Sequence, residues 1–399
     1  MSFAAAAEKI WPVTPDWSNG MQETLSWMTD YLQASATAVS QHRGLRLGPR
    51  RSFVFELLAA GKERRVADML LAGHKGAWLL PIWPDVQLPA GPLESGDSFI
   101  SCRTVGFDFV EGGKALIWAA VNNWEVVSIA AVDSTGLALA SPLASDWPAA
   151  TRLYPLRRAR VQDGAEEILR NDNVSRRSIA FDVTETCDWP TLIEPATYLS
   201  HLVLERRPDE SDDPSASYLR LAQAVDNGTG HPVVHDLPGV SLRTQQSHWK
   251  LWGRDEHSWF RSLLYTLGGR CTPIWVPSFA SDLKAASPVA GGSTLLNVEW
   301  AGYALFGLAK ANRKDILIEM RDGTKLYRRI IGAVQAGDTE NLTIDSPLDD
   351  SSVSPGSIRA ISFMALSTLS GDDVEIDHRT DQDGEATATT GWQAVVPDV

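Results

Sequence analysis

The sequence predicts a mainly β fold with short helices, arranged as two similar β-sandwich or barrel units that each carry one packed helix. Three observations lead to this prediction. Short apolar motifs recur in the same order in both halves of the chain. Segments in which apolar and polar residues alternate, as in half-buried strands, dominate each half. Each half also has one stretch of apolar residues at helical spacing that ends at glycine.

The composition is that of an ordinary globular protein. The chain has 399 residues, enough for two or three domains, with 44% hydrophobic and 22% charged residues. Its net charge of −14 argues against a nucleic-acid binder, and no sequence-specific nucleic-acid binding is expected. No run of 18 apolar residues occurs, so no membrane span is expected. The three cysteines, at 102, 187 and 271, are too far apart for a disulfide scaffold and fit the reducing cytoplasm.

The repeated motifs indicate an internal duplication. The matched segments are Arg51–Leu57 with Ser247–Leu251, Pro81–Trp83 with Pro273–Trp275, Ala115–Ile117 with Ile316–Ile318, Ile129–Val132 with Ile331–Val334, and Ser141–Leu143 with Ser346–Leu348. Upstream, Asp16-Trp17 and Glu23 resemble Asp188-Trp189 and Glu194 at a shorter interval, which places a polar insertion at 208–245. The alternative is two β-rich domains with similar turns.

Residues 1–50 are predicted to form an N-terminal arm and a helix. The arm, Trp11–Pro15, is rich in proline, and Gln22–Leu32 carries Leu25, Trp27, Met28 and Leu32 roughly on one helical face. Such a segment either reaches across to a neighbouring subunit or covers its own unit. The residues leave both alternatives open.

The first β-rich unit is predicted at 51–180. Arg51–Leu58 alternates as a strand, Lys62–Ala72 has helical spacing and ends at Gly73, and Ala77–Trp83 is a further strand. The later strands are expected at 99–102, 114–120 and 125–132, with a hairpin turn at Asn122-Asn123.

The second β-rich unit is predicted at 246–399, after a connecting segment at 181–245 that holds the polar insertion. Ser247–Trp252 and Cys271–Val276 are expected to be strands that flank a helix at Glu256–Leu267. Arg321–Thr324 is a turn. Residues 372–385 form an acidic C-terminal tail, and an arginine-rich cluster lies near the start of the chain, so the two charged regions are either interface faces or solvated surface.

No catalytic, cofactor-binding or metal-ligating residue is predicted, and we do not expect an enzyme. His231 and His235 have the spacing of a helical zinc pair, but Pro232 and two valines argue against a helix there. Asp381–Glu385 lacks the closing glutamate of a calcium loop. The chain has no phosphate-binding glycine loop and no Gly-x-Ser-x-Gly elbow. The cysteines are expected to be buried structural thiols.

The chain is unusually rich in tryptophan, with 15 residues, which suits contact-forming surfaces and thin β cores. Two similar units in one chain allow three chains to build a ring of six similar units. Ring closure needs heterologous contacts, which aromatic side chains often anchor. The sequence therefore predicts an assembly protein.

Two groups of residues, one in each half, share a spacing of aromatic and arginine side chains. The first group is Trp17–Gly20, Glu23–Asp30, Arg43–Arg46 and Pro49–Phe53. The second group is Trp252–Glu256, Phe260-Arg261, Gly268–Arg270, Pro273–Pro277 and Asp282-Leu283. Both groups resemble tail proteins of tailed bacteriophages, specifically distal tail or baseplate hub proteins of long non-contractile tails.

The resemblance implies a structural component of the virion tail tip, folded in the host cytoplasm before assembly. It implies self-association into a ring, a trimer or a hexamer, that closes the tail tube. The implied partners are the tail tube protein, the tape-measure protein and other baseplate hub or fibre proteins. The duplication departs from the simplest distal tail proteins, which have one tube-like domain, and this leaves the ring order open.

Two other functions are weighed against this one. A glycan-binding module would use exposed tryptophans, such as Trp124 or Trp147, as stacking platforms for sugars. A hydrolase of cell-envelope polymers would need paired carboxylates, which spatial proximity alone can supply.

Overall fold

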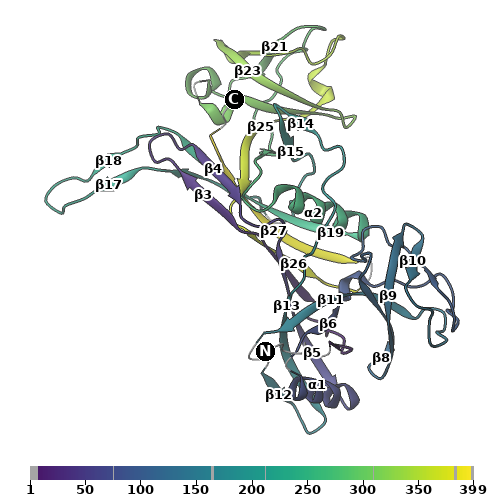
Figure 1. Cartoon of the computed structure of the whole chain (residues 1–399). Coiled ribbons are helices and arrows are strands. Elements are labelled where there is room, and N and C mark those ends of the chain that lie inside the picture. Colours follow the sequence, from purple (N-terminus) through teal and green to yellow (C-terminus); the bar gives the residue numbers. More distant parts are fainter. Residues whose placement is uncertain are drawn as a thin grey trace.

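The computed structural model describes residues 8–396, apart from residues 75, 163–165, 212, 309 and 382–383. Strands account for nearly half of the described chain and far outnumber helical residues, and two α-helices pack against the strands. Long strands cross the middle of the molecule, and α1 (Lys62–Gly73) lies at the end opposite β21 (Leu295–Glu299) and β23 (Lys325–Ala336) (Figure 1). The predicted mainly β fold with short helices is confirmed.

The first unit comprises β1 to β13 and the helix α1. Its elements are β1 Lys9–Ile10, β2 Met21–Ser26, β3 Thr29–Gln33, β4 Ser40–Gly44, β5 Arg50–Ala60, α1 Lys62–Gly73, β6 Trp78–Pro81, η1 Trp83–Asp85, β7 Phe99–Ser101, β8 Lys114–Ala120, β9 Asn123–Asp133, β10 Gly136–Leu139, β11 Arg152–Val161, β12 Glu167–Leu169 and β13 Val174–Val183.

The second unit comprises β15 to β27 and the helix α2, after a connecting segment that contains β14 Thr197–Tyr198. Its elements are β15 His201–Val203, β16 Ala216–Arg220, β17 Gln223–Val225, β18 Val233–His235, β19 Ser241–Trp252, α2 Gly253–Leu267, β20 Ile274–Pro277, β21 Leu295–Glu299, η2 Tyr303–Gly307, η3 Ala311–Arg313, β22 Asp315–Met320, β23 Lys325–Ala336, β24 Thr339–Ile344, η4 Pro355–Ser357, β25 Ile358–Leu369, β26 Asp373–His378 and β27 Glu385–Ala394.

The two units share one pattern of strand pairing. β5 pairs with β13 as β19 pairs with β27, and β11 joins β6, β8 and β13 as β25 joins β20, β22 and β27. The parallel pairs β1–β6 and β15–β20 also correspond. A register shift interrupts β9–β10 and β23–β24 at the same place, after Ile129 and Ile330. Such agreement in order, direction and irregularity is what an internal duplication produces.

The register shows which repeated motifs are equivalent. Ala115–Ile117 and Ile316–Ile318 occupy the same positions in β8 and β22, as the sequence predicts. The Pro-Ile-Trp match is displaced by four residues, because Pro81 faces Leu156 whereas Pro277, and not Pro273, faces Met364. The chance recurrence of a tripeptide therefore misaligned this part of the halves.

A seam between edge strands joins the units. β2 of the first unit pairs along its whole length with β26 of the second, from Met21 opposite His378 to Ser26 opposite Asp373. The result is one antiparallel sheet in the order β16–β19–β27–β26–β2–β5–β13–β12. The last edge strand of one unit thus meets the first edge strand of the other.

The helix predicted at Gln22–Leu32 is wrong. This segment forms β2 and the start of the β3–β4 hairpin, and Met21, Glu23 and Leu25 point alternately into the core. The period of two places all three on one face, which the helical spacing of Leu25, Trp27 and Met28 concealed. The preceding arm covers its own unit, since Trp11 is fully buried against Trp78 and Phe181.

The segment at 208–245 is not an insertion unique to the second half. β16 pairs with β19 as β2 pairs with β5, and the β17–β18 hairpin follows β16 as β3–β4 follows β2. The match of Glu23 with Glu194 is therefore wrong, because the register places Ala216 opposite Gln245 where Glu23 faces Phe53. Both hairpins project from the same side of the molecule in Figure 1.

The acidic stretch that begins at Asp372 is not a tail. It forms β26, in the middle of the long sheet, with Val374, Ile376 and His378 buried. Only the alternate residues, such as Glu375 and Asp377, face outward. The many acidic residues suggested a solvent-exposed segment, although every second side chain of this strand lies in the core.

Candidate functional site

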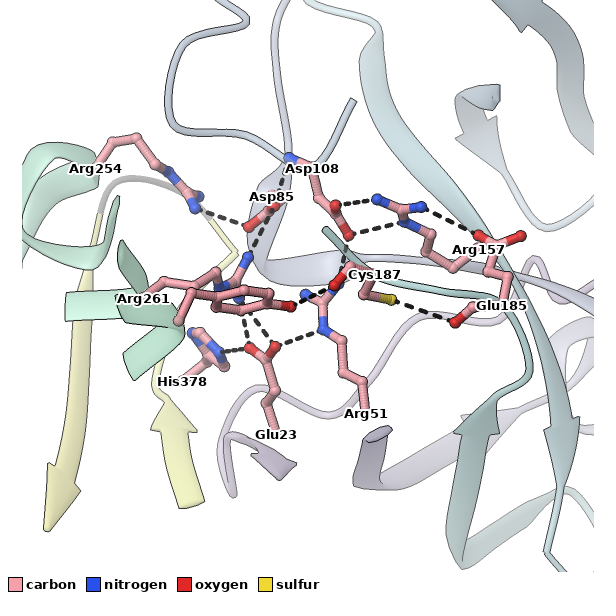
Figure 2. A network of polar contacts seen from close by, with 11 residues as sticks. Glu23, Arg51, Asp85, Asp108, Arg157, Glu185, Cys187, Arg254, Arg261 and His378 are labelled. Atoms are coloured by element: carbon pink, nitrogen blue, oxygen red, sulfur yellow. Dashed lines mark hydrogen bonds and ion pairs between the residues drawn. The ribbon is translucent and has the colours of Figure 1, made fainter. Parts of the chain in front are cut away.

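A buried network of charged side chains lies where the two units meet (Figure 2). The first unit contributes Glu23, Arg51, Asp108 and Arg157, which are each less than 5% exposed. Asp85 of η1 is fully buried beside them. The second unit contributes Arg254 and Arg261 of α2 and His378 of β26. The two units are therefore held together by this charged network in addition to the β2–β26 strand pairing.

Glu23 is the centre of one half of the network. Its carboxylate accepts hydrogen bonds from Arg51 Nε at 2.5 Å and from Arg261 Nη2 at 2.7 Å. His378 Nε2 lies 2.8 Å from Glu23 Oε2. Three groups from three different elements thus converge on one carboxylate (Figure 2).

Asp108 and Asp85 form the other half. Asp108 pairs with both Arg51 and Arg157, and Arg157 Nε lies 3.1 Å from Asp108 Oδ2. The backbone N–H of Asp108 donates to Asp85 Oδ2, while Arg254 Nη1 lies 2.7 Å from Asp85 Oδ1. Every carboxylate of the network therefore has at least one arginine partner.

These pairings keep Glu23 and Asp108 ionised. Burial raises the pKa of Glu23, but the charges of Arg261 and Arg51 outweigh burial and hold this pKa well below its ordinary value. For Asp108, Arg51 and Arg157 likewise outweigh the effect of burial and lower the pKa to about 2. A carboxylate with so low a pKa is a poor proton acceptor near neutral pH. The arrangement is better suited to stabilising the contact between the two units than to acid–base catalysis.

The sequence held a signal for this network that its apolar pattern obscured. Glu23 lies in phase with the buried Met21 and Leu25, and Arg51 lies in phase with the buried Phe53 and Phe55. A charged residue at a core-facing position of a strand needs a buried partner of opposite charge. Two such positions on neighbouring strands predict an ion pair, although not its partners in the second unit.

The ends of the long sheet form a second candidate site. Among the described strands, β16 pairs only with β19 and β12 pairs only with β13, so each leaves one edge open. Open edges of this kind pair readily with another chain. Their apolar side chains are exposed as well, with Tyr218 at 58% and Ile168 at 58%.

The two tryptophans named as sugar platforms differ in exposure. Trp147 is 4% exposed, and its Nε1–H donates to Glu125 Oε2 at 3.0 Å, so it cannot stack on a ligand. Trp124 is 38% exposed on β9. Most of the largest buried side chains are aromatic, among them Trp11, Trp83, Trp275 and Trp392.

The residues considered for metal and thiol chemistry are not brought together. His231 and His235 are exposed on the β17–β18 hairpin. In the described part of the chain, no three histidine, cysteine or acidic side chains are grouped so as to hold a metal ion. Cys102 and Cys187 are buried, and burial raises the pKa of both thiols, that of Cys102 to about 12. The expectation of a buried strand residue is wrong for Cys271, which is half-buried in the turn before β20. Two residues of the Asp381–Glu385 loop lie outside the described part.

No protein-family model matches the chain, and no curated protein is similar to it in sequence. None of the described helices has the length and hydrophobicity that crossing a bilayer requires.

Proposed function

We propose that the protein is a structural component of a bacteriophage tail tip, in which copies of the chain join into a closed ring. The β2–β26 seam is the observation that carries this proposal. The strand pattern makes β2 equivalent to β16 and β26 equivalent to β12. The seam therefore joins the β26-type edge of one unit to the β2-type edge of the next.

The edges left open are of the same two types. β12 of one copy can pair with β16 of another in the arrangement that β26 and β2 already adopt. Since Ile376 lies opposite Glu23 in the seam, the equivalent register places Glu167 opposite Ala216. A heterologous contact that repeats in this way closes into a ring when its rotation permits.

The uncovered face of the long sheet supports the same proposal. Around the seam it presents small and polar side chains, which are half-buried or exposed: Gln22, Thr24, Ser52, Glu375, Asp377, Thr387 and Thr389. Such a face is suited to the water-filled inside of a ring. With the tail-protein resemblance, this favours a ring that closes the tail tube and contacts tube, tape-measure and fibre proteins, with no catalysis of its own.

The direct test is the assembly state of the whole chain. Sedimentation over a range of protein concentrations and negative-stain electron microscopy should show closed rings with an even number of similar units. Labelled antibody should bind the tail tip of virions that contain the protein. A chain that stays monomeric at every concentration, and that is missing from the tail tip, would contradict the proposal.

A proline on the open edge of β16 tests the pairing itself. Ser215 accepts a hydrogen bond from the N–H of Gln246, so by alternation the N–H of Ala216 points away from β19. Ala216→Pro should therefore preserve the monomer but weaken the ring, whereas Ala216→Val, which keeps the N–H, should not. If both variants assembled as the parent does, β16 would not be a ring contact.

A further inference from the structure

The helix of each unit has a different environment, although the two helices are equivalent. Aligned by their core-facing residues, Ala67, Leu70 and Leu71 of α1 correspond to Phe260, Leu263 and Leu264 of α2. In α2 seven side chains are buried. Two of them, Arg254 and Arg261, point away from their own unit and are buried because α2 lies against the first unit. In α1, whose residues are all described, only Ala67 is buried.

The contacts of α2 define the place on the first unit that receives a helix. Arg261 reaches Glu23 of β2, beside Arg51 of β5. The N-terminal part of α2 lies on the loop after β7, where Arg254 stacks 4.2 Å from the Phe107 ring and a Cβ at Gly106 would come within 3.3 Å of Ser258. The receiving place is thus bounded by β2, β5 and the β7–β8 loop.

The equivalent place on the second unit is a cavity. It has a volume of about 500 Å³ and lies between β16, β19 and the loop after β21. Arg243 takes the position of Arg51, since Arg51 pairs with Leu25 as Arg243 pairs with Tyr218. Gly302 and the buried Tyr303 follow β21 as Gly106 and the buried Phe107 follow β7. What α2 fills on the first unit is therefore open on the second.

The cavity is basic and aromatic. Arg220, Arg243, Lys310 and Arg313 line it, with Tyr303, Phe306 and Phe363. Nε of Arg243 is buried without a hydrogen-bond partner in the described part of the chain. Burial lowers the pKa of Arg243, and Arg313 acts in the same direction against the attraction of Asp282. An acidic side chain entering the cavity would relieve this excess of positive charge.

Helix α1 carries the matching charge. In the alignment of the core-facing residues, Asp68 stands where α2 has Arg261, and its side chain is 55% exposed, with Arg177 at 3.5 Å. We propose that α1 of one copy packs into this cavity of a second copy, with Asp68 facing Arg243 and Arg65 lying against the Ala301–Tyr303 loop. This interface rests on the proposed ring and assigns its partner surfaces.

The polarity of the two sites is opposite, which fixes the order of units. On the first unit the receiving site is acidic and takes arginines, whereas on the second it is basic and would take an aspartate. An α2 helix entering the basic cavity would bring Arg254 and Arg261 toward Arg243 and Arg313. Such like-charge contacts disfavour wrong pairings.

Charge reversal tests the interface. Asp68→Lys should raise the protein concentration at half assembly at least tenfold, and Arg243→Glu should do the same. The double variant should recover part of the loss. Glu111→Lys, which makes the same charge change at an exposed turn of the first unit, should leave assembly unchanged.

Crosslinking tests proximity independently of affinity. In assembled protein, Arg65→Cys with Ala301→Cys should form an interchain bond with a short bismaleimide, while Arg65→Cys with the exposed Val334→Cys should not. Any bond must join two chains, because α1 and β21 lie at opposite ends of the molecule (Figure 1). Intact rings in which Asp68→Lys assembles normally and no bond forms would overturn this interface and leave the ring proposal standing. Absence of rings from the parent protein would overturn both.

Discussion

The first and second units have the same strand pairing, yet only the first has its helix-receiving site filled. On the first unit, Arg254 and Arg261 of α2 enter between β2, β5 and the β7–β8 loop. On the second, the corresponding space is a cavity of about 500 Å³ lined by arginines and aromatic rings. The difference arises from chain connectivity, since the first unit has the second as its covalent neighbour.

In the proposed ring, the chain would contain one complete contact between units and half of the next contact. The complete contact consists of the β2–β26 pairing and the α2 site. The half contact consists of two open edges, an uncovered helix and an open cavity. Four tests examine this difference between the filled and the open site, from the largest expected effect to the smallest.

The largest effect is expected at the filled site. Glu23→Ala would leave Arg51, Arg261 and His378 buried without their shared carboxylate, and should lower the free energy of unfolding by about 3–5 kcal/mol. Chemical denaturation of the monomer measures this. Glu56→Ala, which removes a half-exposed partner of Arg176 from the other face of β5, should cost less than about 1 kcal/mol. Equal losses of unfolding free energy for the two variants would show that the buried network does not stabilise the contact between the units.

The second-largest effect is expected from equivalent leucines of the two helices, whose replacement by alanine should destabilise the protein to different extents. Leu263 of α2 is 1% exposed, and Leu263→Ala should cost about 2–5 kcal/mol through the cavity it leaves. Leu70 of α1 is only half-buried, and Leu70→Ala should cost about 1 kcal/mol in the monomer. Thermal and chemical unfolding provide the comparison. A monomer in which Leu70→Ala is the costlier change would mean that α1 is already covered.

Acid should weaken the filled site in a defined range of pH. The pKa of Asp108 is lowered to about 2 in the folded protein, and that of Glu23 is also well below its ordinary value. Because both pKa values are lower in the folded state, their contribution is fully present above the ordinary carboxyl pKa of about 4 and is lost as pH falls toward 2. The denaturation midpoint should fall over this range, and less steeply in Asp108→Asn. A midpoint that is constant from pH 5 to 2.5 would contradict this.

The smallest effect is expected at the longer hairpin. Replacing residues 220–241 with Asn-Gly joins the hydrogen-bonded pair Leu219 and Leu242 by a two-residue turn, and should change monomer stability by less than about 0.5 kcal/mol, because β17 and β18 are exposed throughout. In the equivalent hairpin, Tyr31→Ala should cost about 1 kcal/mol, since Arg270 stacks 4.1 Å from the Tyr31 ring. Unfolding curves of the two variants test this, and a larger loss from the hairpin replacement would contradict it.

Much of the fold is readable from local patterns. The helices at 62–73 and 253–267 and the turns at Asn122 and Asp322-Gly323 lie where period and turn residues predict them. β2 and β26 were missed because charged residues stand at or beside their core-facing positions, and a charge is read as surface unless its partner is known. The partner of Glu23, Arg261, lies more than two hundred residues further along the chain, and no local sequence pattern predicts so distant a pairing.

The equivalence of the units was visible in the sequence, but its register was not. Apolar tripeptides recur by chance, and only ladder pairing distinguishes Pro277 from Pro273 as the counterpart of Pro81. The charged groups around α2 and the cavity beside β19 depend on how one unit meets the next. Their positions follow from the assembled sheet and from no single segment.

The seam between β2 and β26 also bears on how fast such chains could associate. Two units tethered by one polypeptide meet at a high effective concentration, so half of all unit-to-unit contacts would form during folding and would not depend on dilution. Only the remaining half would require collision between molecules. Each chain would then enter assembly as a preformed pair, and fewer incomplete intermediates would have to survive before closure.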